Sequence, residues 1–168
     1  MPEKETVVRA RRDAREGKSP STQAGEFVRE EMHHIRQGKH GARSTKQAIA
    51  IALSKARRSG VKLSAPKKGE ASSATRAKAQ QDMRTGRSAG RRKPSSRRSR
   101  ATLGALKREG RAAASTKSLS RQTRSAARQQ SGASRRQAAL KAVRTKGTSG
   151  MKRAASKAAA TRIRKKAA

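Results

Sequence analysis

Uncompensated positive charge constrains the last 99 residues of this chain more than any other feature. Residues 70–168 contain 29 lysines and arginines but three acids, Glu70, Asp82 and Glu109, and they contain no Phe, Tyr or Trp. Such a segment repels itself and has few large apolar side chains to bury. We therefore expect residues 66–168 to form a long, low-complexity basic tail rich in Ala, Ser, Arg and Lys. Without a bound polyanion, this tail is predicted to be disordered or transiently helical.

The N-terminal part of the chain differs in composition, because it carries mixed charges. Residues 1–69 contain 17 basic and seven acidic residues, and all seven acids precede residue 32. The whole chain has a formal charge of +36. This asymmetry predicts a mostly α-helical protein in which a small helical module, residues 1–65, precedes the basic tail. Because Phe27 is the single aromatic residue, we expect a small core, no pocket of enzymatic size and no enzymatic activity.

Apolar spacing and helix-start signals predict three helices in this module. Acids followed by arginines favour a helix over residues 3–16. Residues 23–37 and 45–59 carry apolar stripes at helical spacing, and Ser44 with Gln47 forms a capping-box pattern, so these two helices are expected to form a hairpin. The basic tail also has helix-forming composition, but its charge density is expected to fray the helices it forms. The tail stretches concerned are 73–85, 101–113, 120–130, 134–146 and 151–166.

The residue types present disfavour several kinds of site. The chain has no cysteine, so it forms no disulfide and no thiolate metal site. His33, His34 and His40 match no metalloprotease spacing, and we interpret them as surface residues or phosphate contacts. We therefore expect no bound metal and no cofactor.

The apolar segments are too short to indicate a membrane protein. The longest strictly apolar run, residues 48–53, is far shorter than a bilayer span, and residues 1–18 lack the apolar core of a signal peptide. The basic tail also lacks the apolar face that a membrane-surface helix needs. We therefore expect a cytoplasmic protein without a membrane partner.

Nucleic acid is the expected partner, because each phosphate neutralised by Lys or Arg releases a condensed counterion. Arg outnumbers Lys by 19 to 10 in residues 70–168, and a guanidinium group can bind phosphate through two parallel hydrogen bonds. Sequence-tolerant, histone-like binding of duplex DNA is the favoured function. The expected contact residues are Arg43, Lys46, Arg57, Arg58, Lys62, Lys67, Lys68, Arg87, Arg91, Arg92, Lys93, Arg97, Arg98, Arg100, Lys107, Arg108, Arg111, Arg135, Arg136, Lys152, Arg153, Arg162, Arg164, Lys165 and Lys166.

Three alternatives stay open at this point. The hairpin can be interpreted as a helix-turn-helix that reads bases from residues 43–47, although a plain hairpin is favoured. RNA or ribosome binding is the alternative function, because ribosomal RNA is as anionic as DNA. Pairing of two copies through the hairpin is a further possibility.

Residues 21–34 (STQAGEFVREEMHH), continuing through 38–51 to 61–63, resemble a family of small, highly basic bacterial proteins of unassigned function. Residues 100–111 (RATLGALKREGR) look like a further block of the same family. Its members are often labelled DNA-binding proteins, so the resemblance implies DNA binding. The tail is similar in composition to the tails of linker histones and bacterial histone-like proteins.

Overall fold

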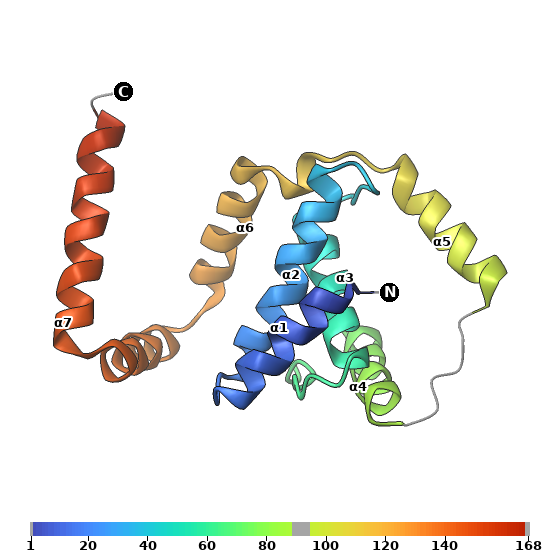
Figure 1. The fold of residues 1–168 in the computed structure, drawn as a ribbon, viewed down its shortest axis with the longest axis horizontal. Helices are drawn as coiled ribbons and strands as arrows, with labels where there is room; N and C mark the ends of the chain where they lie inside the picture. The colour runs from blue at the N-terminus through green and yellow to red at the C-terminus, as the bar shows by residue number, and fades with distance from the viewer. Residues whose placement is uncertain (1, 89–94, 167–168) are drawn as a thin grey trace. The chain divides into compact units, whose positions relative to one another are not determined.

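The computed structural model describes residues 2–88 and 95–166, with backbone alone for residues 146, 165 and 166. The described residues are mostly helical and contain no β-strand beyond one isolated bridge, between Lys68 and Ala71. In chain order the elements are α1 (Lys4–Arg15), α2 (Pro20–Arg36), α3 (Thr45–Arg58), α4 (Ser73–Arg87), α5 (Ser96–Arg108), the 3-10 helix η1 (Ala112–Ala114), α6 (Thr116–Gln129) and α7 (Gly132–Lys166) (Figure 1).

The three helices predicted for the N-terminal module are confirmed as α1, α2 and α3. Helix α2 begins three residues before its predicted start, because Ser19 accepts a hydrogen bond from the Thr22 N–H and Pro20 fits the first turn. Ser44 caps α3 by accepting from the Gln47 N–H, and the Gln47 side chain accepts from the Arg43 N–H. Half of the expected capping box is therefore present: Ser44 caps α3, whereas Gln47 accepts from Arg43, the residue before the cap, and not from Ser44.

The expectation of a long disordered or transiently helical tail is wrong. Helices α4, α5, α6 and α7 cover most of the described residues after residue 72. Ala, Arg, Lys and Gln are among the strongest helix formers, whereas a like-charge pair on one helix face costs only about 0.2–0.5 kcal/mol. Serine side chains also cap these helices: Ser72 accepts from the Thr75 N–H and Ser115 from the Ser118 N–H. Helix propensity and capping therefore outweigh charge repulsion.

The chain divides into two compact units, Met1–Gln122 and Thr123–Ala168, and the division falls within α6. The first unit contains α1 to α5 and η1. The second consists of the end of α6 and the long helix α7, which is interrupted at Gly147 by a backbone with φ of 65° and ψ of 173°. A positive φ of this kind suits glycine, because it has no Cβ.

In the first unit, α2 occupies the centre (Figure 1). Helix α1 packs on one side of α2 and α3 on another, and α4 packs on α3. The predicted hairpin of α2 and α3 is therefore part of a larger helical assembly that includes a segment from beyond residue 72.

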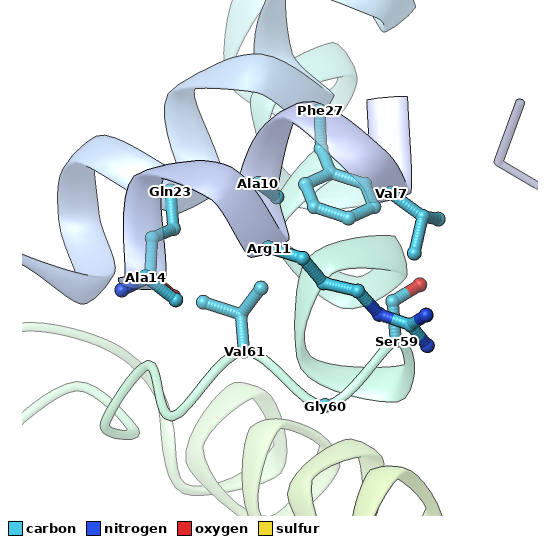
Figure 2. A pocket seen from close by; sticks show the side chains of 9 residues that line it. All are labelled: Val7, Ala10, Arg11, Ala14, Gln23, Phe27, Ser59, Gly60 and Val61. Carbon is cyan, nitrogen blue, oxygen red and sulfur yellow. The ribbon is translucent and has the colours of Figure 1, made fainter. Parts of the chain in front are cut away.

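A shallow hollow opens where α1 and α2 meet the end of α3 (Figure 2). Its walls are apolar, from Val7, Phe27 and Val61, and Arg11 lies along its edge beside Ser59. Its volume of about 150 Å³ is smaller than the roughly 300–1,000 Å³ of typical ligand pockets.

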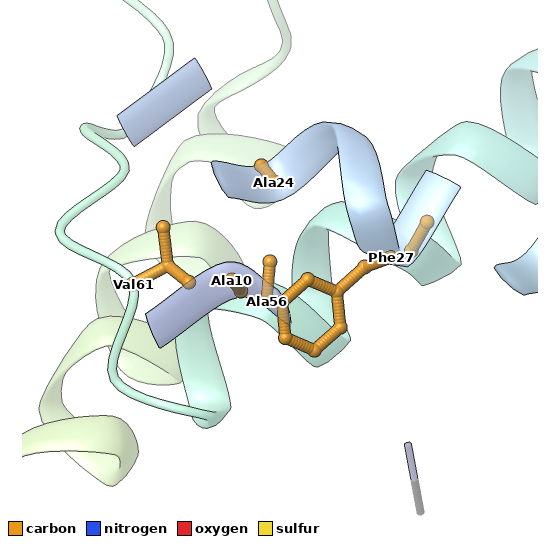
Figure 3. Packing of buried hydrophobic residues seen from close by; sticks show 6 residues of the cluster. Ala10, Ala24, Phe27, Ala56 and Val61 are labelled. Atoms are coloured by element: carbon orange, nitrogen blue, oxygen red, sulfur yellow. The ribbon is translucent and has the colours of Figure 1, made fainter. Parts of the chain in front are cut away.

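The hydrophobic core beneath this hollow consists of one aromatic ring and several small side chains (Figure 3). Phe27, from α2, is 1% exposed and packs among the methyl groups of Ala10, Ala52 and Ala56, which come from α1 and α3. Val61 folds back from the end of α3 to complete the cluster. Alanine at these contacts allows the helices to approach closely.

A second cluster forms where the chain returns to the α2–α3 connection. Met32, Ile35 and Ala48 pack there against Ala113 and Ala114 of η1. We call residues 106–114 the returning segment. Hydrogen bonds also hold it: the Gly41 N–H donates to the Leu106 carbonyl at 2.9 Å, and the Ala42 N–H to the Gly110 carbonyl at 3.2 Å. Arg36 donates to the Ala114 carbonyl and Thr45 to the Ala113 carbonyl.

Docking of the returning segment requires glycine at position 41. A Cβ atom there would lie 1.9 Å from the Glu109 carbonyl oxygen. We expect Gly41→Ala to lower the free energy of unfolding by about 1–3 kcal/mol, because backbone must move to remove the clash. Denaturant titration followed by circular dichroism measures this change.

Gly25→Ala in the exposed face of α2 is the matched control. A Cβ atom at Gly25 meets nothing within 4 Å. Since Ala is better than Gly inside a helix by about 0.5–1 kcal/mol, this variant is expected to be as stable as the wild type or more so. Equal destabilisation by both substitutions contradicts the role assigned to Gly41.

Candidate nucleic-acid interface

Most of the few acidic residues of the chain form ion pairs within the first unit. All ten Asp and Glu residues belong to Met1–Gln122. Eight of them lie within 4.0 Å of a Lys or Arg nitrogen: Glu3, Glu5, Asp13, Glu16, Glu26, Glu31, Asp82 and Glu109. These carboxylates are therefore already neutralised locally.

Several of these pairs join neighbouring helices. Arg9 of α1 donates to Glu26 of α2 at 2.7 Å, and Lys55 of α3 donates to Glu31 of α2 at 2.5 Å. Asp82 of α4 is buried, and it accepts a hydrogen bond from Ser54 of α3 at 2.5 Å. These three acids thus lie at helix contacts.

Hydrogen bonds within these pairs shift the pKa values of exposed groups. Those from His34 and Lys39 lower the pKa of Glu3 to about 2. Hydrogen bonds to Asp13 and Glu16 raise the pKa of Lys18. Both shifts favour the charged forms, so the Glu3 carboxylate and the Lys18 ammonium group are charged at neutral pH.

The second unit carries positive charge without any acid. Thr123–Ala168 contains 14 Lys and Arg residues and no Asp or Glu. Where side chains of this unit are described, every Lys and Arg is exposed. No carboxylate within this unit can neutralise that charge, so its counterions come from outside the unit.

Most of the sequence-predicted contact residues are exposed on the described surface. In the first unit they are Arg43, Lys46, Arg58, Lys62, Lys67, Lys68, Arg87, Arg97, Arg98, Arg100, Lys107, Arg108 and Arg111. In the second unit they are Arg135, Arg136, Lys152, Arg153, Arg162 and Arg164, all on α7. Arg91, Arg92 and Lys93 lie outside the described residues, and for Lys165 and Lys166 only the backbone is described.

Arg57 differs from the other predicted contacts because it is buried, with 7% of its surface exposed. Its guanidinium group donates to the Leu63 carbonyl at 3.2 Å and to the Ser64 carbonyl at 3.1 Å. Burial lowers the pKa of Arg57. Arg57 therefore holds the segment after α3 in place, and we leave it out of the proposed interface.

The start of α3 is partly covered, which bears on the helix-turn-helix alternative. Thr45 is buried and donates its hydroxyl to the Ala113 carbonyl, so this side chain is not available to contact bases. Arg43 is exposed, with its Nε 3.6 Å from a Glu109 oxygen, and Lys46 is exposed one turn further on. The exposed side chains of Arg43 and Lys46 suit contact with phosphates.

A cationic stripe along α6 was not among the sequence-predicted contacts. Lys117, Arg121, Arg124 and Arg128 follow one another at intervals of four, three and four residues, so they share one helix face, and all four are exposed. The signal that identifies them is this spacing, which becomes meaningful once residues 116–129 are known to be helical.

The interpretation of all three histidines as surface residues is wrong. His33 is exposed, but His34 is 8% exposed, and the side chain of His40 is 10% exposed. His34 faces α1, where its Nε2 lies 2.8 Å from a Glu3 oxygen. His33 and His34 are consecutive residues on different sides of α2. The acid that contacts His34 most closely, Glu3, directly precedes α1 and lies 31 residues earlier, beyond the reach of local sequence patterns.

Comparisons with known proteins give no match: the chain matches no family model, no curated protein and no solved structure. The resemblance to a family of basic bacterial proteins therefore stays a prediction. Within the part of the chain that the structure describes, each helix is too short or too polar to cross a membrane.

The placement of Arg57 predicts a stability effect that an exposed cation does not have. Arg57→Ala removes the donors to two carbonyl groups and is expected to lower the free energy of unfolding by about 1–3 kcal/mol. Lys62→Ala removes the same charge from an exposed position and is expected to change stability by less than about 0.5 kcal/mol. Denaturant unfolding of both variants tests the distinction, and similar stability losses contradict it.

Proposed function

We propose that this protein binds duplex DNA through the sugar-phosphate backbone with little sequence preference, as a nucleoid-associated, histone-like protein of the bacterial cytoplasm. The observation that carries the proposal is the composition of the second unit, which has 14 Lys and Arg residues and no Asp or Glu. Every one of these cations whose side chain is described is exposed. Ordinary small domains carry net charges of magnitude about 2–8 and mix both signs on the surface. An isolated unit with this composition is stabilised by a polyanion that supplies the missing negative charge.

The arrangement of cations on α6 supports contact with phosphates. The stripe from Lys117 to Arg128 extends over about 16 Å at 1.5 Å per residue. Its side chains lie one helical turn apart on a single face, so a duplex backbone alongside α6 can contact all four. Three of the four are arginines, which can each hold a phosphate through two hydrogen bonds.

The lack of stacking residues supports duplex DNA over single-stranded nucleic acid. Proteins that bind single strands and RNA loops stack the bases on exposed aromatic side chains. Phe27 is the single Phe, Tyr or Trp of the chain, and it is 1% exposed in the core. Binding through phosphates needs no such platform.

RNA or ribosome binding remains the alternative function. Pairing of two copies through the hairpin stays a prediction.

Salt dependence tests whether binding is electrostatic. If about ten phosphates are contacted, the logarithm of the association constant is expected to fall with the logarithm of salt concentration at a slope near −9 on duplex DNA. Fluorescence anisotropy with duplexes of unrelated sequence measures the slope. A slope near zero, or affinities that differ strongly between sequences, contradicts the proposal.

Neutralising the α6 stripe is expected to weaken binding to all duplexes alike. Replacing Lys117, Arg121, Arg124 and Arg128 by Gln removes four phosphate contacts, so the magnitude of the salt slope should fall by about 3–4. Glutamine preserves helix propensity at these exposed positions. The control replaces the three arginines by Lys, which keeps the charge and is expected to keep the slope. An unchanged slope in the Gln variant removes α6 from the interface.

Identification of the nucleic acid bound in cells distinguishes DNA binding from RNA binding. Crosslinking, purification of the protein and sequencing of the attached nucleic acid are expected to recover DNA fragments spread across the genome. The quadruple Gln variant serves as the control and should recover less DNA. Recovery of mainly ribosomal RNA overturns the DNA proposal in favour of the alternative.

A further inference from the structure

Three side chains with metal-binding atoms converge beside the α2–α3 connection. Glu31 and His34 lie one turn apart on α2, and His40 follows in the connection. One ligand atom from each lies within 4.8 Å of the others. None of these residues belongs to the proposed DNA contacts, so the cluster is a separate feature of the first unit.

The carboxylate of Glu31 is fully buried, and within the described part of the chain only one of its two oxygens accepts a hydrogen bond. One oxygen, Oε2, accepts a hydrogen bond from Lys55 at 2.5 Å. The other oxygen, Oε1, accepts no hydrogen bond from the described residues, and it lies 3.4 Å from Nε2 of His40. A buried carboxylate oxygen without a partner is costly, so Oε1 needs a cation or a donor.

The hydrogen bonds of His40 leave its inward-facing nitrogen without a proton in the neutral ring. Nδ1 of His40 lies 3.1 Å from the Gly41 carbonyl oxygen, and because a carbonyl can only accept, Nδ1 is the donor. The lone pair of Nε2 then faces the lone pairs of Glu31 Oε1. Two acceptors in contact repel each other unless a positive group bridges them.

His34 follows the same pattern. Its Nε2 donates to the Glu3 carboxylate at 2.8 Å, which leaves Nδ1 as the nitrogen available to a metal. Each histidine therefore donates one N–H to a carbonyl or carboxylate oxygen. This outer partner fixes the tautomer and orientation of metal-binding histidines in known sites.

The local charge also suits a divalent cation. With both imidazoles neutral, the charged groups around the cluster sum to a net charge of −1. These groups are Glu3, Glu30, Glu31, Lys39 and Lys55. Lys55 bonds one oxygen of Glu31 and leaves the other for a metal.

We propose that Glu31, His34 and His40 bind a divalent transition-metal ion, with Zn²⁺ as the fitting example. Two imidazoles and one carboxylate suit Zn²⁺ or a neighbouring transition metal, whereas Mg²⁺ and Ca²⁺ prefer oxygen ligands. Bonds of about 2.1 Å place adjacent ligands of a tetrahedral site roughly 3.4 Å apart. Glu31 Oε1 and His40 Nε2 already have that spacing.

A metal at this position would fasten the connection that holds the returning segment. His40 directly precedes Gly41 and Ala42, whose N–H groups donate to the Leu106 and Gly110 carbonyls. The metal would tie His40 to α2 and so restrict the backbone at these two residues. Its expected role is structural, stabilising the docking of residues 106–114 on the α2–α3 hairpin.

Metal titration of the full, untagged chain after chelator treatment tests the site. Co²⁺ is expected to bind with one equivalent and to give visible d–d absorption, and Zn²⁺ is expected to displace it. His40→Gln should weaken binding at least tenfold. His33→Gln is the matched control, because His33 is an exposed histidine on the helix that carries Glu31 and His34, and it should bind as the wild type does.

Side-chain nitrogen NMR of the wild-type chain gives a readout that does not depend on the folding of a variant. Addition of Zn²⁺ is expected to shift the ring nitrogens of His34 and His40 and to leave His33 unchanged, while amide exchange at Gly41 and Ala42 slows. Absence of Co²⁺ absorption, equal loss in the two Gln variants, or shifts at His33 overturns the proposal. A protonated His40 paired with Glu31 would then occupy the place of the metal.

Discussion

Carboxylates placed between helices are the interaction on which the first unit depends. Glu26 joins α2 to α1 and Glu31 joins α2 to α3, while Asp82 joins α4 to α3. Removing one partner of a buried ion pair leaves an uncompensated charge and typically costs about 3–5 kcal/mol. These few acids thus specify which helices are neighbours. These three acids are paired at helix contacts, and few other acids remain to balance the lysines and arginines of the surface.

Small residues make these contacts possible in a chain with one aromatic ring. Alanines from α1, α2 and α3 surround Phe27, so the helices approach closely enough for their side chains to pair (Figure 3). Backbone meets backbone where α4 ends against α3: a Cβ atom on Gly86 would lie 2.1 Å from the Arg57 carbonyl oxygen. Close packing of small groups recovers contact density that large side chains provide in other cores. Such packing tolerates few substitutions, because each close contact between helices requires a specific small residue.

The sequence predicted α1, α2 and α3 because each has local signals: a cap, a periodic apolar stripe or a charge gradient. The sequence also indicated helix-forming composition after residue 72, but the prediction that charge density would fray these helices was wrong, because helix propensity and capping outweigh the repulsion. Ala113 and Ala114 pack on the hairpin without any periodic pattern of their own. The burial of His34 depends on Glu3, 31 residues earlier, and no local pattern reveals such a contact. The cationic stripe of α6 was readable from spacing but only after the helix was known.

The charge pattern of α7 bears on the kind of polyanion that fits it. Before Gly147, Arg135, Arg136, Lys141 and Arg144 point to different sides of the helix, and the exposed Leu140 and Val143 lie among them. A membrane-surface helix needs separate apolar and cationic faces, which this segment lacks. A helix in the major groove of B-DNA instead has phosphates on both sides, and the groove is about 12 Å wide. The major groove of A-form RNA is too narrow for this. The spread of cations over several sides of α7 therefore supports the proposed binding of duplex DNA over binding of a membrane surface or an RNA duplex.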